Sequence, residues 1–226
     1  DFICLEDGIS RINMKIRSEV ESEINGLGPE ISSEAIKKMF DRLDELQEGD
    51  ILVLAGSIPA SMPESMYRDI MKRLADRKLK IAVDATKSLL LNVLPFHPFV
   101  IKPNNHELGE LFNVKIKSKD QAVEYAKKLQ EMGAQNVIVS MAGEGAVFVG
   151  DDGSVFQSEA PKGTVVNSVG AGDSMVAGFL AGYLGEGDYK EAFKLGVCTG
   201  SASAFSEQLA TREQVDAIRN THHFQF

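Results

Sequence analysis

Apolar and polar positions alternate near the start of the chain in a pattern typical of β-strands. Between residues 9 and 24, apolar side chains recur at every second position. Ile12, Met14 and Ile16 would therefore share one face of a strand. The opposite face would carry the polar residues Arg11, Asn13 and Lys15. We expect a hairpin of two strands here, and a solvated outer face is the simpler interpretation of its polar side.

Beyond this hairpin, apolar runs of strand length alternate with segments of helical periodicity. The expected strands are 51–55, 80–84, 99–101 and 136–141, and we expect the first to be buried on both faces. The expected helices between them are 32–46, 63–76, 85–94, 104–111 and 119–133. A second hairpin at 146–149 and 154–157 precedes helices at 171–184, 189–206 and 211–218.

This order of elements predicts one α/β domain with a mostly parallel sheet covered by helices on both faces. Ligands of such sheets bind at the carboxyl ends of the strands, in the loops that follow them. Those loops are residues 56–57, 84–85, 102–107, 140–145 and 170–173, and they hold most of the polar and glycine-rich groups considered below.

Composition narrows the classes of function. The 226 residues carry a formal net charge of -9, which argues against a nucleic-acid surface because phosphate contacts need clustered Lys and Arg. No run of apolar residues is long enough to span a membrane. Cys4 and Cys198 lie far apart in the sequence, which suits reduced thiols in a cytoplasmic protein.

A glycine-rich turn between an apolar pair and an apolar helix is the strongest chemical signal. The amides of Gly170, Ala171 and Gly172 can approach a ligand closely, and they precede a helix whose positive dipole end favours an anion such as phosphate. Asp173 would repel a phosphate, so a carboxylate here makes sense as a proton acceptor. The alternative is that Asp173 only caps the helix.

The sequence from Val169 to Ser174 resembles the C-terminal signature of the ribokinase-like (PfkB) carbohydrate kinases. The resemblance implies a three-layer α/β/α fold with a small β lid, here at about residues 9–28. It also implies that the amides of Gly170, Ala171 and Gly172 form an anion hole, and that Asp173 is the base that activates the acceptor hydroxyl. ATP and Mg²⁺ are the implied cofactors.

Two further segments resemble motifs of that family. Asn104 and Glu107 match its Asn-x-x-Glu motif, which implies a role in holding Mg²⁺ through water, although an Asn-capped helix start explains the same spacing. The strand end and loop at 140–145 resemble the nucleotide loop. The implied nucleotide-binding residues are Lys102, Asn104, Ser140, Met141, Ala142, Gly143, Glu144, Gly145 and Gly172.

The sugar side of the site is implied by the hairpin and by the loop at 56–59, which resembles the family's substrate loop. The implied substrate-binding residues are Arg11, Asn13, Lys15, Ser57, Lys162 and Asp173. Two cations on the lid suit a sugar that already carries a phosphate. The lid sequence is most similar to 1-phosphofructokinases, which convert fructose 1-phosphate to fructose 1,6-bisphosphate, and tagatose-6-phosphate kinases are the alternative. An exposed lid edge predicts a homodimer formed through the lid.

The resemblance is incomplete at the front of the chain. Family members begin with a strand whose Asp holds the sugar and with a Gly-Gly segment, and neither is found here. We therefore expect a family member that lacks roughly its first quarter. A nucleotide-binding fragment without catalysis is the rival interpretation. A dinucleotide-binding oxidoreductase is disfavoured because Met175 stands where the third glycine of that fingerprint belongs.

Overall fold

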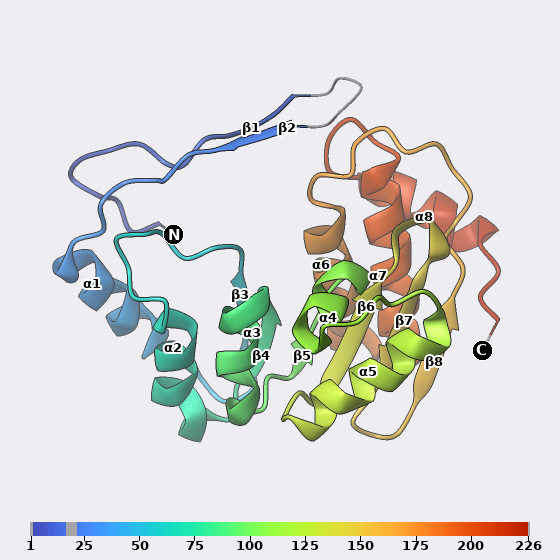
Figure 1. The fold of residues 1–226 in the computed structure, drawn as a ribbon, viewed down its shortest axis with the longest axis horizontal. Helices are drawn as coiled ribbons and strands as arrows, with labels where there is room; N and C mark the ends of the chain where they lie inside the picture. The colour runs from blue at the N-terminus through green and yellow to red at the C-terminus, as the bar shows by residue number, and fades with distance from the viewer. Residues whose placement is uncertain (1, 17–21, 226) are drawn as a thin grey trace.

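The computed structural model describes residues 2–16 and 22–225. Within these ranges the main sheet has six strands in the order in which they follow along the chain (Figure 1). The first four strands pair in parallel, and the last two pairings are antiparallel. The strands are β3 (Ile51–Ala55), β4 (Lys80–Asp84), β5 (Val100–Ile101), β6 (Asn136–Ser140), β7 (Ala146–Val149) and β8 (Val155–Ser158).

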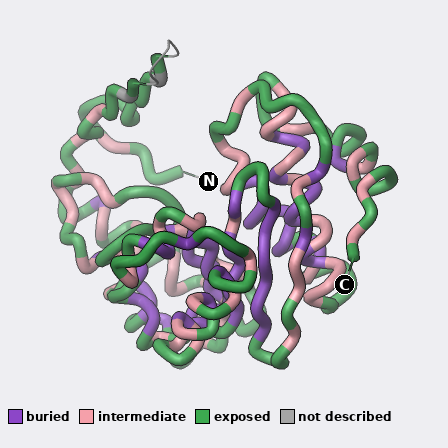
Figure 2. The backbone as a smooth tube through the Cα atoms, turned by 45° about the vertical axis from the view of Figure 1, so that its right-hand side comes forward, coloured by how far each residue is buried: buried purple, intermediate pink, exposed green. Residues whose placement is uncertain are grey.

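Helices cover both faces of this sheet, so the predicted three-layer α/β/α fold is confirmed. One face packs against α1 (Ser33–Leu43), α2 (Met66–Leu74), α3 (Lys87–Val93), α4 (Asn105–Phe112) and α5 (Lys119–Glu131). The other face packs against α6 (Ala171–Glu186) and α7 (Tyr189–Ala204), with α8 (Arg212–Thr221) beside α7. Short 3₁₀ turns are η1 (Ala75–Arg77), η2 (Leu94–Phe96) and η3 (Ala142–Glu144). The buried residues accordingly lie in the strands and on the helix faces that contact the sheet (Figure 2).

Close packing of α6 on α7 fixes the position of the glycine-rich turn. A Cβ on Gly182 would lie 2.7 Å from the Ala192 Cα, so only glycine allows the two backbones to approach this closely. Near the other end, a Cβ on Gly200 would lie 3.0 Å from the Ala171 carbonyl oxygen. The first turn of α6 therefore rests directly on the backbone of α7.

The predicted N-terminal hairpin is present but shorter than expected. Strands β1 (Asn13–Ile16) and β2 (Ser22–Asn25) pair antiparallel and extend away from the main body (Figure 1). The expected strand residues 17–21 lie outside the described ranges, and residues 9–12 are not in a strand. The apolar side chains of the hairpin are exposed rather than packed: Ile12, Met14, Ile16 and Ile24.

The expectation that 51–55 is buried on both faces is wrong. Leu52 and Leu54 pack into the core under α1 and α2, whereas Val53 points to the opposite face and is 46% exposed. β3 is an edge strand of the six-stranded sheet. The helices α6 and α7 pack mainly over the neighbouring strands β4 to β7. A run of apolar residues looks the same in a central strand and in an edge strand that is covered on one side only.

Candidate active site

The glycine-rich turn starts α6 and leaves backbone amides exposed. Gly170 is the N-cap, in a left-handed conformation with φ 77° that favours glycine. The Ser174 amide donates the first intrahelical bond, to the Gly170 carbonyl at 2.8 Å. The amides of Gly172 and Asp173 precede it and so have no acceptor within the helix. The Ala171 amide, expected to belong to the anion hole, donates instead to the Ser168 carbonyl at 3.3 Å. Asp173 lies three residues inside the helix, so the interpretation of this residue as an N-cap is wrong.

Lys102 brings a buried positive charge to this turn. Its Nζ lies 3.4 Å from an Asp84 carboxylate oxygen, and both side chains are largely buried. A Cβ on Gly172 would stand 3.0 Å from the same Nζ. The carboxyl ends of β4 and β5 therefore place an ion pair against the first turn of α6.

Asp84 is the functional candidate that sequence reasoning missed. Burial raises the pKa of the Asp84 carboxyl above its usual value, Lys102 lowers it, and nearby Asp173 and Glu107 raise it. Asp84 is therefore paired with the buried Lys102 ammonium and lies within electrostatic reach of two further carboxylates, those of Asp173 and Glu107. Asp84 is the last residue of a predicted strand, and that position at its carboxyl end was the available signal.

Asn104 and Glu107 form a capping box at the start of α4. The Asn104 side-chain oxygen accepts the amides of His106 and Glu107, each at 2.9 Å, and the Glu107 carboxylate accepts the Asn104 amide at 2.8 Å. The alternative that this spacing marks an Asn-capped helix start is therefore correct for the oxygens that form these bonds. Asn104 also forms a parallel bridge with Ser140, which brings two of the predicted nucleotide-binding residues together.

A cavity of about 700 Å³ extends from the start of α6 to the C-terminal part of α7. Its apolar lining includes Met175, Val197, Ala204 and Phe205, and Gly172 and Asn104 also line it. The predicted site residues that line it are Asn104, Ser140, Ala142, Gly143, Gly145, Lys162, Ala171 and Gly172. This is the size and polarity of a pocket for a small organic ligand.

Two of the residues predicted to bind the nucleotide do not line this cavity, and one predicted to bind the sugar does. Met141 does not line the cavity, because its side chain is buried in the core below the loop. Glu144 is exposed outside it. Lys162, expected among the substrate-binding residues, lines the cavity together with the expected nucleotide-binding residues instead. Position 145 requires glycine, because a Cβ there would lie 1.9 Å from the Ser158 carbonyl oxygen.

Apart from Lys162, the predicted sugar-side residues do not line that cavity, and two of them are in contact. The Arg11 guanidinium donates to the Ser57 hydroxyl at 2.5 Å, linking the segment before β1 to the loop after β3. Asn13 lies in β1 opposite Asn25. Lys15 is in the same strand, and its side chain is outside what the structure describes. Asp173 is exposed at the turn.

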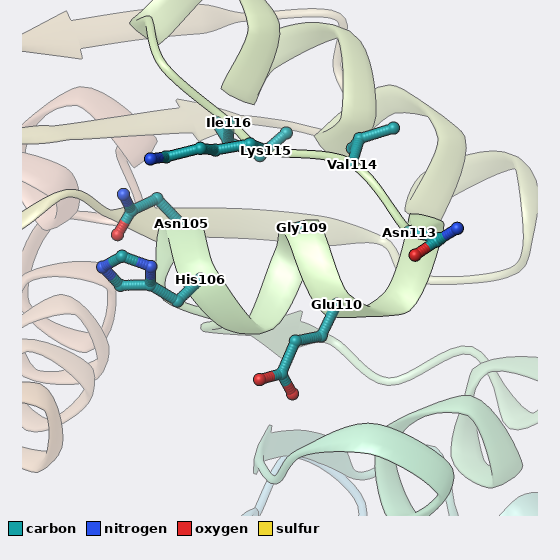
Figure 3. A pocket seen from close by; sticks show the side chains of 8 residues that line it. All are labelled: Asn105, His106, Gly109, Glu110, Asn113, Val114, Lys115 and Ile116. Carbon is teal, nitrogen blue, oxygen red and sulfur yellow. The ribbon is translucent and has the colours of Figure 1, made fainter.

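A smaller hollow of about 480 Å³ lies on the outer face of α4, between that helix and residues 113–116 (Figure 3). Asn105 and His106 line both this hollow and the larger cavity. The outer hollow is therefore an extension of the rim of the larger cavity rather than a separate pocket.

The comparison with known proteins decides the family. The model for "pfkB family carbohydrate kinase" matches residues 6–215. The chain belongs to this family. Among its relatives is a 1-phosphofructokinase of Bacillus subtilis, 49% identical over 93% of this chain and 69% of the relative. A D-tagatose-1-phosphate kinase of Bacillus licheniformis is 34% identical over 96% of this chain and 71% of the relative.

The structural comparison gives the same assignment for this pfkB kinase. A putative phosphofructokinase from Staphylococcus aureus superposes with a TM-score of 0.84 at 38% identity, covering 94% of this chain and 69% of the other. The chain is thus a sugar kinase, a phosphotransferase of a family that uses ATP. The tagatose relative is named for the 1-phosphate, which differs from the 6-phosphate of the expected alternative.

None of the helices in the described ranges has the length and apolar composition needed to cross a membrane. No set of three or more His, Cys, Asp or Glu side chains in the same ranges is arranged to hold a metal ion.

Proposed function

We propose that this pfkB kinase transfers the γ-phosphoryl group of ATP to the C6 hydroxyl of fructose 1-phosphate, giving fructose 1,6-bisphosphate. The observation that carries the proposal is the start of α6, where amides without an acceptor in the helix and the exposed Asp173 carboxylate occur in one turn beside a 700 Å³ cavity. A phosphate group and an acceptor hydroxyl need these two kinds of partner.

The reaction assigns one role to each part of the turn. Asp173 accepts the proton of the hydroxyl as its oxygen attacks the γ-phosphorus, and the bond from that phosphorus to the β–γ bridging oxygen breaks, so that ADP leaves. The amides of Gly170 and Gly172 and the Lys102 ammonium stabilise the charge on the transferred group. Lys162 adds a further cation at the cavity wall.

The cavity suits ATP in shape and polarity. Its apolar lining, with Val197 and Phe205, suits a purine base, and Ala171 and Gly172 at the start of α6 line it as well. Ala142, Gly143 and Gly145 of the loop after β6 also line it and would contact the ribose and phosphates. Ser140 and Asn104, which bridge β6 to the start of α4, complete that wall.

Asn104 and Glu107 are the proposed holders of Mg²⁺, through bound water. Glu107 and Asp173 both act electrostatically on Asp84, and negative charge from several carboxyl groups suits a divalent cation. The capping box uses one oxygen of each side chain, which favours water-mediated over direct contact. When bound with ATP, Mg²⁺ supplies neutralisation of phosphate charge.

Fructose 1-phosphate is the proposed acceptor because two lines of support agree. The Bacillus subtilis relative at 49% identity is a 1-phosphofructokinase. In addition, the lid contributes the cations Arg11 and Lys15, which suit a substrate phosphate. Ser57, bonded to Arg11, would contact the same phosphate.

A substrate panel tests this assignment. ADP release from ATP would be measured with fructose 1-phosphate, tagatose 1-phosphate, tagatose 6-phosphate and fructose 6-phosphate, each over a range of concentrations. We expect the highest kcat/KM with fructose 1-phosphate. A preference for another sugar phosphate would overturn the substrate assignment. ATP binding without transfer to any acceptor would favour the rival interpretation, a nucleotide-binding fragment.

We also propose that two copies associate through the lid. The apolar side chains Ile12, Met14, Ile16 and Ile24 are exposed on the β1–β2 hairpin, and a second copy of this chain would cover them. Sedimentation equilibrium of the wild type should give twice the chain mass, and Met14→Glu should give the monomer. An unchanged mass for Met14→Glu would contradict the interface.

A further inference from the structure

Asp84 and Lys102 occupy equivalent positions on neighbouring strands. Val83 of β4 pairs with Ile101 of β5 in parallel register, so the two charged residues follow directly as the next pair. Ala82 and Val100, two residues earlier, face the α6–α7 layer, and period-two alternation turns Asp84 and Lys102 to the same side. The sheet itself therefore sets the 3.4 Å ion pair under the first turn of α6.

The Lys102 ammonium lies in an unfavourable place without an anion. It faces the start of α6, where the helix dipole is positive, and its Nζ lies 3.0 Å from the point where a Gly172 Cβ would be. Its side chain is only 7% exposed, so water solvates it poorly. Asp84 is the one acidic group that is recorded in an ion pair with it among the described residues.

A carboxylate this close to a phosphate site would by itself weaken phosphate binding, because like charges repel. Asp84 therefore needs a role that outweighs the repulsion. We propose that Asp84 is a positioning residue that holds the Lys102 ammonium against the first turn of α6, so that Lys102 and the helix amides contact the same phosphoryl group. This inference deepens the proposed function and rests on it.

The two residues have different roles in this proposal. Lys102 touches the phosphoryl group and is the catalytic cation, whereas Asp84 acts only through Lys102. Asp84 is thus distinct from Asp173, which is exposed at the turn and accepts the proton. Removing the Asp84 carboxylate should impair the enzyme only while Lys102 is present.

A double-mutant cycle tests this dependence. The variants are Asp84→Asn, Lys102→Gln and the two combined. Asp50→Asn is the matched control, because Asp50 lies at the opposite, amino end of β3 and accepts the Gln47 amide at 2.8 Å. We expect each single variant at the site to lower kcat by about tenfold or more, with the KM for the sugar phosphate nearly unchanged. The control should keep wild-type kinetics.

The combined variant decides the question. If Asp84 acts through Lys102, the combined kcat equals that of Lys102→Gln alone within about twofold. Multiplied losses would overturn the proposal and give Asp84 an independent role. A loss of activity that follows a lowered thermal midpoint in Asp84→Asn alone would assign Asp84 to stability and would also overturn it.

A binding measurement separates this inference from the proposed function. The Kd for ATP would be measured by calorimetry without a sugar, so that no transfer is needed. We expect Asp84→Asn to weaken ATP binding about threefold or more in the wild-type background, and to strengthen it in the Lys102→Gln background, where only repulsion is removed. The same effect in both backgrounds would refute the coupling even if the enzyme phosphorylates no sugar tested.

Discussion

Arg11 donates a 2.5 Å hydrogen bond to the Ser57 hydroxyl across 46 positions of sequence. This contact joins the segment before β1 to the loop after β3, two parts that were each expected to bind the sugar phosphate. The bond is exposed, so it stabilises the fold little and leaves both groups accessible to a ligand.

The first prediction concerns this pair. Arg11→Ala should raise the KM for the sugar phosphate by about tenfold to a hundredfold, because a charged contact to a phosphate is lost, while the KM for ATP changes little. Steady-state kinetics with each substrate varied in turn measures both values. Arg42→Ala, on the exposed surface of α1, is a matched control that should leave both KM values unchanged. Equal increases in the two KM values would place Arg11 outside the sugar site.

The second prediction separates stability from activity at Gly172. Alanine is usually the better helix former by about 1 kcal/mol, so Gly172→Ala should not destabilise α6. Its Cβ would nevertheless press on Lys102, and we expect kcat to fall by about tenfold. Gly185→Ala in the same helix has open space around it and should keep full activity. Urea unfolding and kcat, measured on both variants, test this, and an active Gly172→Ala would contradict the close approach.

The third prediction concerns thiol reactivity. Burial raises the pKa of Cys198 to about 11, whereas Cys4 is exposed. Alkylation proceeds through the thiolate, so at pH 8 iodoacetamide should modify Cys4 alone in the folded protein. Mass spectrometry should detect a second adduct only after unfolding in urea. Two adducts on the folded protein would contradict the burial of Cys198.

The fourth prediction concerns a buried amide at the amino end of β6. Asn136 donates to the Phe99 carbonyl at 2.8 Å and to the Tyr189 hydroxyl at 3.3 Å, and it accepts the Asp151 amide at 3.2 Å. Asn136→Ala should lower the free energy of unfolding by about 1–2 kcal/mol, since three hydrogen bonds of a buried side chain are lost while the Phe99 carbonyl keeps its bond to the backbone amide of residue 136. Asn92→Ala, on the exposed surface of α3, should lower it by less than about 0.5 kcal/mol. Equal effects in urea unfolding would contradict this network.

Much of the fold could be predicted because local pattern and tertiary context agree. The α1, α5 and α8 helices begin beside Ser32, Ser118 and Thr211, whose side chains cap them, and their apolar spacing matches the buried face. The glycine-rich turn was equally readable, because Gly170 needs its positive φ and Gly172 leaves room for Lys102.

The failures have physical causes that a linear pattern does not contain. Burial of Val53 depends on how far α6 and α7 extend across the sheet, which no local spacing encodes. Asp84 was missed because its partner Lys102 lies on the next strand, so that only strand register brings them together. The capping box at Asn104 and the magnesium motif share one spacing, and the hydrogen bonds alone reveal the cap.

In the proposed reaction Asp173 is the base in phosphoryl transfer and not a residue that binds ATP. Asp173→Asn keeps the size of the side chain and removes its proton-accepting charge. We predict that kcat with fructose 1-phosphate falls by about a thousandfold, while the Kd for ATP measured by calorimetry stays within about threefold of the wild type. Wild-type turnover by Asp173→Asn, or equal losses in kcat and ATP binding, would contradict the account.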